Sequence, residues 1–382
     1  MKENKTKPDI RFKGFTEAWE QRKLGELLEK YEDPVETPHD GYERLGIRSH
    51  AKGTFHSFVE SGEELNSARM HRVAANKFIL NITFAWEHAV AITDKNDEGK
   101  LVSHRFPQFS FDKCLKSNFF KYLILDEKFR KHLELSSPGG AGRNRVLKIS
   151  DMLEYKIYLP SIDEQTEIGQ YFSHLDNLIT LHQRECDQLK ELKKSMLKKM
   201  FPRDGSNIPE VRFAGFTDAW EQRKLGEIIE VNSGKDYKHL KSGNIPVYGT
   251  GGYMLSVNDA LSFDKDAIGI GRKGTIDKPY ILKSPFWTVD TLFYAIPKEN
   301  YTLNFVFGIF QKIDWKSMDE STGVPSLSKA TINNVRVSYP NSTEQIKIGQ
   351  YFSKLDDLIT LHQRELEILK NLKKTCLKRM FI

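Results

Sequence analysis

Two long stretches of the chain repeat one pattern of apolar and polar positions. Residues 160–201 align with residues 340–381 without a gap, at a constant offset of 180, and residues 178–185 recur letter for letter as residues 358–365. In both copies, apolar residues recur at three- and four-residue steps between Glu, Lys, Arg and Gln. Such a narrow stripe, with an average spacing of about 3.5 residues, is typical of coiled-coil helices. The pattern predicts two long helices that pair with each other.

Leucines dominate the predicted seam between these helices, and one position in each copy holds a histidine instead. A seam histidine is either a metal-binding or catalytic group, or a polar residue that fixes the register of the pair, as a buried Asn can. We favour the second interpretation, because no further His lies at ligand spacing beside either histidine in the sequence. The predicted seam residues are Leu175, Leu178, His182, Leu189 and Leu192 in the first copy, and Leu355, Leu358, His362, Leu369 and Leu372 in the second.

The predicted helices carry start and stop signals. Each follows a proline and a sequence of the capping-box type, Ser161-x-x-Glu164 in the first copy and Ser342-x-x-Gln345 in the second. The first helix is expected to stop at Pro202, because proline cannot continue a helix. At 1.5 Å per residue, a helix of this kind is a rod of roughly 55 Å.

A second, shorter repeat precedes each variable part of the chain. Residues 8–26 recur as residues 209–227, at an offset of 201 rather than 180. The chain is therefore a tandem duplication in which a leader, a variable part and a long helix follow one another twice. The predicted segments are a first leader, residues 1–26; a first globular domain, 27–159; a first helix, 160–201; a linker with the second leader, 202–227; a second globular domain, 228–339; and a second helix, 340–382.

The variable parts mix strand-like and helix-like stretches. Residues 78–84 read as a strand, and residues 267–275 read as a strand that leads Arg272 and Lys273 into a glycine-flanked turn. Residues 119–135 have the pattern of an amphipathic helix. Loops rich in Gly and Ser, residues 136–145 and 321–329, occupy equivalent places in the two parts. The prediction is an α/β fold of the α+β kind, with two globular domains separated by an antiparallel pair of long helices and related by a pseudo-two-fold internal repeat.

Composition narrows the class of protein. The chain has 382 residues, of which 39% are hydrophobic and 29% charged, and a net charge of +6, which is compatible with a polyanionic partner. No apolar run is long enough to span a membrane and no apolar signal segment opens the sequence, so we expect a cytoplasmic protein. Cys114, Cys186 and Cys376 form no CxxC pair, and neither a disulfide framework nor a metal site is expected.

None of the common catalytic or nucleotide-binding motifs is present. The sequence lacks the G-x-x-x-x-G-K-[ST] phosphate loop, the G-x-G-x-x-G fingerprint, the G-x-S-x-G elbow and the H-E-x-x-H zinc motif. It also lacks an Asn-Pro-Pro or Asp-Pro-Pro segment of the kind that orients an amino group for methylation. We therefore expect no catalytic residue and no bound cofactor on this chain.

The variable parts instead carry Arg, Lys, Asn, Ser, Thr and Tyr near glycine-flanked turns. Such side chains contact phosphates and base edges, with Arg to guanine and Asn to adenine as the leading pairings. We expect the group as a whole, rather than any single member, to bind DNA. The candidates are Arg48, Ser49, Arg69, Arg72, Asn81, Arg143, Asn144 and Arg145 in the first part, and Lys235, Tyr237, Tyr248, Thr250, Arg272, Lys273, Ser326 and Lys329 in the second.

The repeated blocks resemble those of the specificity subunits of Type I restriction–modification enzymes. The resemblance covers essentially the whole chain, and its strongest carriers are the leader Pro-[Asp/Glu]-[Ile/Val]-Arg-Phe-x-Gly-Phe-Thr and the helix motif Leu-Ile-Thr-Leu-His-Gln-Arg-Glu. It implies that each globular domain is a target recognition domain that reads one half of a split, asymmetric DNA sequence. It also implies that the paired helices set the spacer between the two halves.

The resemblance further implies partners that carry the chemistry. Two adenine-methyltransferase subunits would dock on the repeated regions, translocating endonuclease subunits would join them, and S-adenosylmethionine, Mg²⁺ and ATP would bind to these partners. Two alternatives remain open: a single-chain methyltransferase or nuclease, and a cytoplasmic coiled-coil scaffold that binds only proteins. A methylation assay of the isolated chain tests the first alternative, and the salt dependence of DNA binding tests the second.

Overall fold

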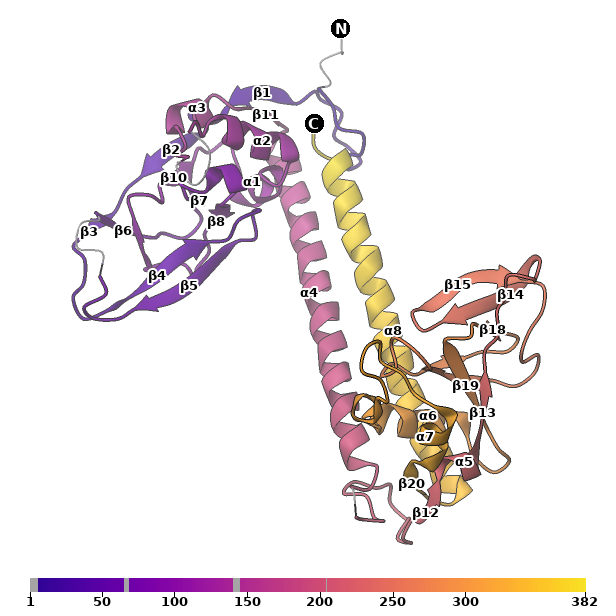
Figure 1. Ribbon diagram of the computed structural model, residues 1–382. Coiled ribbons are helices and arrows are strands. Elements are labelled where there is room, and N and C mark those ends of the chain that lie inside the picture. Colours follow the sequence, from indigo (N-terminus) through magenta and orange to yellow (C-terminus); the bar gives the residue numbers. More distant parts are fainter. Residues whose placement is uncertain (1–5, 65–68, 140–144, 204) are drawn as a thin grey trace. The chain divides into compact units, whose positions relative to one another are not determined.

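The chain forms two compact units, and each long helix contributes to both. The computed structural model describes residues 6–64, 69–139, 145–203 and 205–382 (Figure 1). Unit 1 contains residues 1–181 and 366–382, and unit 2 contains residues 182–365. The predicted segments keep each helix whole, whereas the compact units divide both helices near their midpoints. A unit is therefore a leader, a variable part, and a portion of each helix.

Unit 1 has a mixed α/β structure (Figure 1). Its strands are β1 (Glu20–Lys23), β2 (Leu28–Tyr31), β3 (Pro34–Val35), β4 (Tyr42–Ile47), β5 (Thr54–Val59), β6 (Met70–Arg72), β7 (Phe78–Leu80), β8 (Val90–Ile92), β9 (Leu101–Ser103), β10 (Gln108–Phe111) and β11 (Lys156–Leu159), and its short helices are α1 (Ser117–Leu123), α2 (Glu127–Leu135) and α3 (Ile149–Leu153). The strands form sheets in the orders β1-β11, β2-β10-β7-β8 and β3-β6-β9-β4-β5.

Aromatic residues fill the core of unit 1 between its four-stranded sheet and its short helices. Phe78 on β7 pairs in register with Phe109 on β10, and both side chains are fully buried. The ring of Phe120 on α1 meets that of Phe78 edge to face, with 5.2 Å between the centroids. All three residues of β7 are buried, as expected of a strand covered on both faces. The hairpin β4–β5 belongs to the five-stranded sheet, and Phe55 and Phe58 are exposed on it.

The stretch 119–135, predicted as one helix, is two helices. Asp126 occupies the N-cap position of α2, where its side chain accepts a hydrogen bond from the backbone N–H of Lys128. An N-cap carboxylate satisfies a backbone N–H that has no partner inside the helix, and it therefore starts a new helix at this point.

Unit 2 repeats this organisation with different loops. Its strands are β12 (Glu221–Lys224), β13 (Ile229–Ser233), β14 (Ser242–Gly249), β15 (Gly252–Val257), β16 (Ala267–Gly271), β17 (Tyr280–Leu282), β18 (Trp287–Thr288), β19 (Leu292–Pro297) and β20 (Arg336–Tyr339), and its short helices are α5 (Leu225–Ile228), α6 (Leu303–Lys312) and α7 (Lys329–Asn334). The sheet orders are β12-β20, β13-β19-β16-β17 and β15-β14-β18. The predicted strand is confirmed for residues 267–271, all of which are buried, and the chain leaves the strand at Arg272, as the predicted turn requires.

The two leaders attach to the two units in the same way. Arg11 donates through Nε and Nη2 to the two carboxylate oxygens of Glu164, both at 2.7 Å. Arg212 makes the equivalent two hydrogen bonds to Glu344, at 2.7 and 2.8 Å. Both carboxylates are buried, and a bidentate pair with arginine is the strongest way to satisfy them. The leader of each unit is thus fixed to the first turn of one long helix.

The same leaders also hold the end of the other long helix. Trp19 packs edge to face against Phe381 in unit 1, with 6.4 Å between ring centroids, and Trp220 packs in the same way against Phe201 in unit 2, at 5.9 Å. Both indoles are buried. The two tryptophans are therefore packing anchors at equivalent positions in the repeat.

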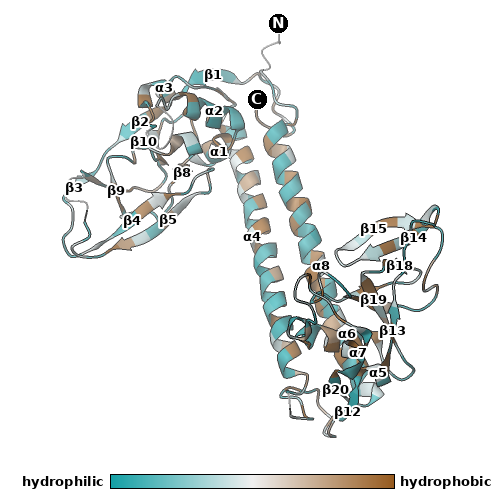
Figure 2. Cartoon of the chain, in the orientation of Figure 1, coloured by the Kyte–Doolittle hydropathy of each residue, from teal (hydrophilic) through white to brown (hydrophobic). Residues whose placement is uncertain are grey.

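The long helices are α4 (Ile162–Lys199) and α8 (Ser342–Arg379). In unit 1, Asp176 near the middle of α4 pairs with Lys373 near the end of α8, and in unit 2, Lys193 pairs with Asp356. The two pairings run in opposite directions along the helices, which confirms the predicted antiparallel pair. Figure 2 shows that α4 and α8 are mainly hydrophilic, with hydrophobic residues recurring at intervals. Across the described ranges, none of the helices combines the length and apolar character that a membrane span requires.

The predicted seam is wrong at three of its positions. Leu175 and Leu355 are buried and Leu178, Leu189 and Leu369 are half-buried, whereas 39–43% of Leu192, Leu358 and Leu372 is exposed. Buried residues that the prediction left out are Cys186, Lys193, Ile359, Leu366 and Cys376, of which only one is a leucine.

The structure gives the reason for this error. From Leu175 the buried face continues at Ile179, His182, Cys186, Leu189 and Lys193, in alternating steps of four and three residues. The prediction stepped by three residues from Leu189 to Leu192, from Leu355 to Leu358 and from Leu369 to Leu372, where the buried face steps by four, and so it left the seam by one residue each time. A lysine can occupy a seam position because its aliphatic stem packs while its ammonium group reaches a partner.

Candidate nucleic-acid interface

Four of the candidate residues of unit 2 meet at the end of strand β16. Arg272 and Lys273 directly follow the strand, and Ser326 and Lys329 lie at the loop and the short helix that precede β20. All four line one hollow of about 700 Å³. A short β-bridge joins Lys273 to Ser326, so the two segments are held together by backbone hydrogen bonds. The sequence separates these segments by more than 50 residues, and the fold unites them.

A tight turn presents the two cations of β16. The backbone N–H groups of Arg272 and Lys273 both donate to the carbonyl oxygen of Thr291, at 2.8 and 3.2 Å. A Cβ atom at Gly271 would lie 2.0 Å from the carbonyl oxygen of Thr275, so only glycine allows the chain to turn this closely. Because the backbone is fixed, the position of both side-chain stems is fixed with it.

The cations of this hollow are available for a ligand. Arg272 and Lys329 both lie over the ring of Phe293, at 5.9 and 6.0 Å from its centroid. Arg272 also donates through Nη1 to the carbonyl oxygen of Asp290, at 3.3 Å. Among the described residues, none of the ion pairs involves Arg272, Lys273 or Lys329. Arginine and lysine without a carboxylate partner suit DNA phosphates and guanine edges.

A carboxylate organises the loop that carries Ser326. Asp319 accepts hydrogen bonds from the backbone N–H of Ser326 at 2.9 Å and from that of Ser321 at 3.0 Å. These hydrogen bonds favour the charged form and lower the pKa of the Asp319 carboxyl. At neutral pH the loop is therefore held by an ionised side chain within it.

The other candidates of unit 2 are more dispersed. Lys235 is exposed, whereas Tyr237 is half-buried and packs against the cluster that contains Trp287. Tyr248 is half-buried on β14, and its ring centroid lies 6.1 Å from that of Tyr280. Thr250 lies close to Gly274, in the turn after Arg272 and Lys273. The structure thus brings Thr250 toward the hollow and gives the two tyrosines packing contacts.

In unit 1, two candidates line a smaller hollow of about 340 Å³. Ser49 donates through Oγ to Glu87 Oε2 at 2.6 Å. Asn81 accepts at Oδ1 from the backbone N–H of Thr83 at 3.0 Å and from its hydroxyl at 2.7 Å. Both polar side chains are therefore oriented by the protein before any ligand binds.

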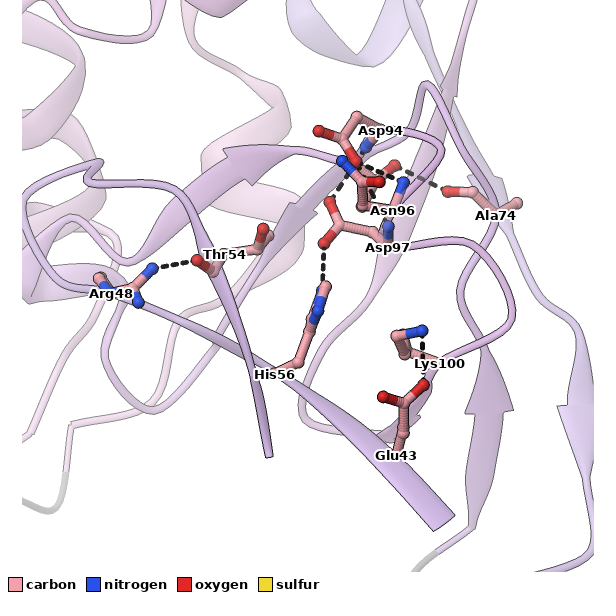
Figure 3. Close-up of polar contacts among 10 residues, drawn as sticks. Glu43, Arg48, Thr54, His56, Ala74, Asp94, Asn96, Asp97 and Lys100 are labelled. Carbon is pink, nitrogen blue, oxygen red and sulfur yellow. Dashed lines mark hydrogen bonds and ion pairs between the residues drawn. The ribbon is translucent and has the colours of Figure 1, made fainter. Parts of the chain in front are cut away.

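Arg48 lies on the β4–β5 hairpin beside this hollow. Its guanidinium group is 5.2 Å from the centroid of Phe55, and it donates to the carbonyl oxygen of Thr54 (Figure 3). His56 Nε2 lies 2.8 Å from Asp97 Oδ1. This contact, drawn in Figure 3, joins β5 to the turn after β8. Asp97 is almost fully buried. The hairpin that carries Arg48 is thus fastened to the body of unit 1.

The remaining arginine candidates of unit 1 stand apart from the hollow. Arg72 lies 3.9 Å from a carboxylate oxygen of Asp33, and Arg145 lies 3.9 Å from one of Glu134 and over the ring of Trp86. Such long, exposed ion pairs contribute little and leave the guanidinium groups free to exchange partners. Arg69 is exposed just before β6. Arg143 and Asn144 lie outside the described residues.

Sequence analysis did not predict the aromatic rings that lie beneath three of the candidate arginines. Phe55, Trp86 and Phe293 each support a candidate arginine from below. The sequence alone does not place Phe293 beside Arg272. Their proximity follows from the sheet register, in which Phe293 pairs with Ile270, two residues before Arg272. An arginine stacked on a ring loses less conformational freedom when it binds, which suits it to recognition.

Comparison with known proteins identifies the scaffold. A sequence model of the family described as "Type I restriction modification DNA specificity domain" matches residues 16–191 and 217–371. The chain is 24% identical over 299 residues to the type I restriction enzyme MjaVIII specificity subunit of Methanocaldococcus jannaschii, which is 66% of this chain and 67% of that protein. It is 25% identical over 252 residues to a putative type I specificity subunit of Mycoplasma genitalium, which is 62% of this chain and 64% of that one.

The matched segments span about two thirds of the length of these curated relatives. A structural comparison covers more of the chain than these sequence matches do. The crystal structure of a type-I restriction-modification system S subunit from M. genitalium superposes with a TM-score of 0.68 at 17% identity, and the match covers 98% of this chain and 99% of that one. Two family matches, one on each repeat, and a shared fold lead to one conclusion. The chain belongs to the type I restriction–modification DNA specificity family, whose members are DNA-recognition subunits and not the catalytic chains.

Proposed function

We propose that the variable part of each unit reads one half of a bipartite, asymmetric DNA sequence, and that the paired helices set the spacing between the halves. The observation that carries this proposal is that one scaffold occurs twice with two different polar surfaces. Unit 2 offers Arg272 and Lys329 over one ring with Lys273 in the same hollow, whereas unit 1 offers Arg48 beside Ser49 and Asn81. Different donors and acceptors on the same scaffold read different base edges, so the two half-sites differ in sequence.

The outer faces of the helices support two copies of one partner. Leu181 on α4 and Leu361 on α8 are equivalent in the repeat, and 48% and 50% of them is exposed. Leu192 and Leu372 are a second equivalent pair, with 39% and 41% exposed. Apolar side chains that recur in this way on solvent-facing helix surfaces favour protein partners. The proposed partners are two adenine-methyltransferase subunits, one for each copy, together with translocating endonuclease subunits.

The cofactors of the complex belong to those partners in this proposal. S-adenosylmethionine would bind to the methyltransferase subunits, and Mg²⁺ and ATP would serve the endonuclease subunits. The chain itself would supply DNA recognition and assembly, without a catalytic residue of its own. A cytoplasmic location follows for a protein that acts on the chromosome of its own cell.

Exchange of one variable part tests the proposal most directly. Residues 228–339 are replaced by the equivalent segment of a relative with a known site, and adenine methylation is mapped in cells that carry the complete complex. We expect one half-site to change and the other to stay. The matched control is the exchange of residues 27–159, which should change only the other half-site. A change in both half-sites after either exchange would contradict independent reading.

Two further assays address the alternatives. If the chain is itself a methyltransferase or nuclease, the purified chain alone will transfer a labelled methyl group or cut DNA; we expect neither. If it is a scaffold that binds only proteins, it will show no DNA affinity. We expect binding that weakens steeply as salt rises, because each phosphate contact releases counterions.

A further inference from the structure

The two seam histidines face each other in unit 2. His182 lies near the middle of α4 and His362 near the middle of α8, at equivalent positions in the repeat. Their Nδ1 atoms are 3.1 Å apart, and their ring centroids are 5.3 Å apart. Each histidine thus has a second histidine at ligand distance, although none lies near it in the sequence. The main argument against a metal-binding role is therefore removed by the fold.

Two carboxylates complete the cluster. Glu365 Oε2 lies 3.1 Å from His182 Nδ1, and Glu185 Oε2 lies 3.3 Å from His362 Nδ1. Within each helix, the glutamate three residues after the histidine lies 3.9 Å away in α4 and 3.8 Å away in α8. Each helix therefore contributes one imidazole nitrogen and one carboxylate to a common centre.

These separations suit a single metal ion. With Zn–N and Zn–O bonds of about 2.0–2.1 Å, the edges of a tetrahedron are about 3.3–3.4 Å. The three closest distances between donor atoms of different helices, 3.1, 3.1 and 3.3 Å, are near that length. His182, His362 and Glu365 have donor atoms that all lie within 4.8 Å of one another. Glu185 lies outside this set, and in our proposal a rotation of its side chain supplies the fourth ligand.

The four donors are accessible and are not engaged elsewhere. The histidine side chains are 18–19% exposed and the glutamates 39–40% exposed, so an ion can enter from solvent. In the described part of the chain, the only ion pairs of Glu185 and Glu365 are those with the two histidines. A pair of imidazoles without metal can share only one Nδ1 proton, whereas a metal ion satisfies both nitrogens and both carboxylates.

We propose that His182, Glu185, His362 and Glu365 form a binding site for one divalent transition-metal ion of the zinc class. Imidazole with carboxylate suits Zn²⁺, Co²⁺ and Ni²⁺, whereas Ca²⁺ and Mg²⁺ prefer oxygen ligands alone. The bound ion clamps α4 to α8 at the point where neither helix offers a leucine. This role is independent of DNA recognition and does not rest on the proposed function.

Titration of the full-length, tag-free protein with Co²⁺ and Zn²⁺ tests the proposal. We expect one Zn²⁺ per chain by calorimetry, visible Co²⁺ bands of tetrahedral nitrogen and oxygen ligation, and a higher thermal midpoint with Zn²⁺. The variants His182→Gln and His362→Gln remove one ligand each and keep a polar side chain. Each should weaken binding by at least the roughly 10–100-fold that loss of an outer-shell partner costs.

The matched control is His174→Gln, which removes an exposed histidine from the same helix outside the cluster. It should bind one Zn²⁺ with unchanged affinity. Three outcomes overturn the proposal: no binding by the unmodified chain, binding that both cluster variants retain, or Co²⁺ bands of thiolate ligation, which would assign the metal to a cysteine. Circular dichroism of each variant checks that the helices remain, so a loss of binding is not a loss of fold.

Discussion

Lys193 Nζ lies 2.5 Å from Asp356 Oδ1, and the residues related to them by the repeat, Lys373 and Asp176, form the same ion pair. The lysine side chain is 11% exposed in the first pair and 22% in the second. A buried lysine needs a partner, and here the partner comes from the other helix. The pair thus fixes the register of α4 against α8 in each unit, which apolar contacts alone do not do.

Charge reversal of this pair should destabilise unit 2 and a second reversal should rescue it. Lys193→Asp places two carboxylates together at a largely buried position, and we expect a loss of about 1–3 kcal/mol, between the values for exposed and buried pairs. The double variant with Asp356→Lys should recover most of that loss. Urea unfolding measures both. Lys194→Asp, at an exposed neighbouring position, is the control and should cost less than half as much. If the double variant is no more stable than Lys193→Asp, the ion pair does not set the register.

Arg272→Ala should weaken DNA binding, and the pattern of the loss will identify its contact. If Arg272 reads a guanine, the loss is about 1–3 kcal/mol and confined to one base pair of the site; if it contacts a phosphate, all sequences lose affinity alike and the salt dependence decreases. Binding of the assembled methyltransferase complex to site variants, measured at several salt concentrations, separates these cases. The control is Arg203→Ala, an exposed arginine paired with Glu210 away from the hollow. Equal affinities for Arg272→Ala and the unmodified chain would remove Arg272 from the interface.

The sequence predicted the long helices and their pairing because a periodic pattern over 38 residues has few alternatives. It did not predict their exact seam. Cys186 and Lys193 do not look like seam residues by their letters, and the exposed Leu192 does. Two sets of residues that differ by one position can both fit a 3.5-residue spacing on the same helix. Only packing against the second helix decides which of these sets is buried. Of the two predicted caps, Ser161 is confirmed, because its Oγ accepts a hydrogen bond from the backbone N–H of Glu164 at 3.3 Å, whereas at the start of α8 the acceptor is Asn341 and not Ser342.

The sequence predicted which types of residue the candidate site contains, but it did not predict which of them lie together on one surface. Arg272 and Lys273 were recognisable next to a glycine-flanked turn, but their contact with the loop of Ser326 depends on a β-bridge between distant segments. The pairing of His182 with His362 likewise depends on antiparallel packing across 180 residues. Local sequence carries no information on such contacts, since tertiary structure alone brings the segments together.

The stability of unit 1 should fall as the pH falls below about 6.5. His88 is buried, and Nε2 donates to the carbonyl oxygen of Ile124 at 2.8 Å. Burial lowers the pKa of His88, although this hydrogen bond acts against the shift; nearby Arg130 and His50 lower the pKa further and Glu127 raises it. Between the lowered pKa and the ordinary value near 6.5, the unfolded chain binds more protons than the folded one. Stability therefore rises with pH across this window and is lost toward acid.

Urea unfolding at pH 7.5 and pH 5.5 measures this effect, with an upper limit of about 1.4 kcal/mol per pH unit for one histidine. His88→Gln should reduce the slope, whatever it does to stability at neutral pH. His174→Gln, at an exposed position on α4, should leave the slope unchanged. Since His71 also has a pKa lowered by burial, a residual slope is expected in His88→Gln. A slope identical to that of the unmodified chain would exclude His88 as a source.

Lengthening both helices should change the spacer of the DNA site and not the bases read. One heptad inserted after Glu185 and one after Glu365 keep the seam in phase and lengthen both helices equally. Seven residues add about 10 Å of helix, and B-DNA rises about 3.4 Å per base pair, so the upper limit is about three extra base pairs. The recognition domains must also rotate to face their grooves, and DNA can bend, so the expected gain is one to about three base pairs.

The same insertions separate His182 from His362. With Lys193 held against Asp356, the new heptad in α4 moves His182 one heptad farther along, so each histidine faces an inserted residue. We therefore expect the longer spacer together with loss of the Zn²⁺ response. Methylation mapping reads the spacer, and calorimetry reads the metal. Heptads inserted in α4 alone are the control, because they break the match between the helices and should abolish methylation. The original spacing in the doubly lengthened protein would mean that the helices do not set the distance.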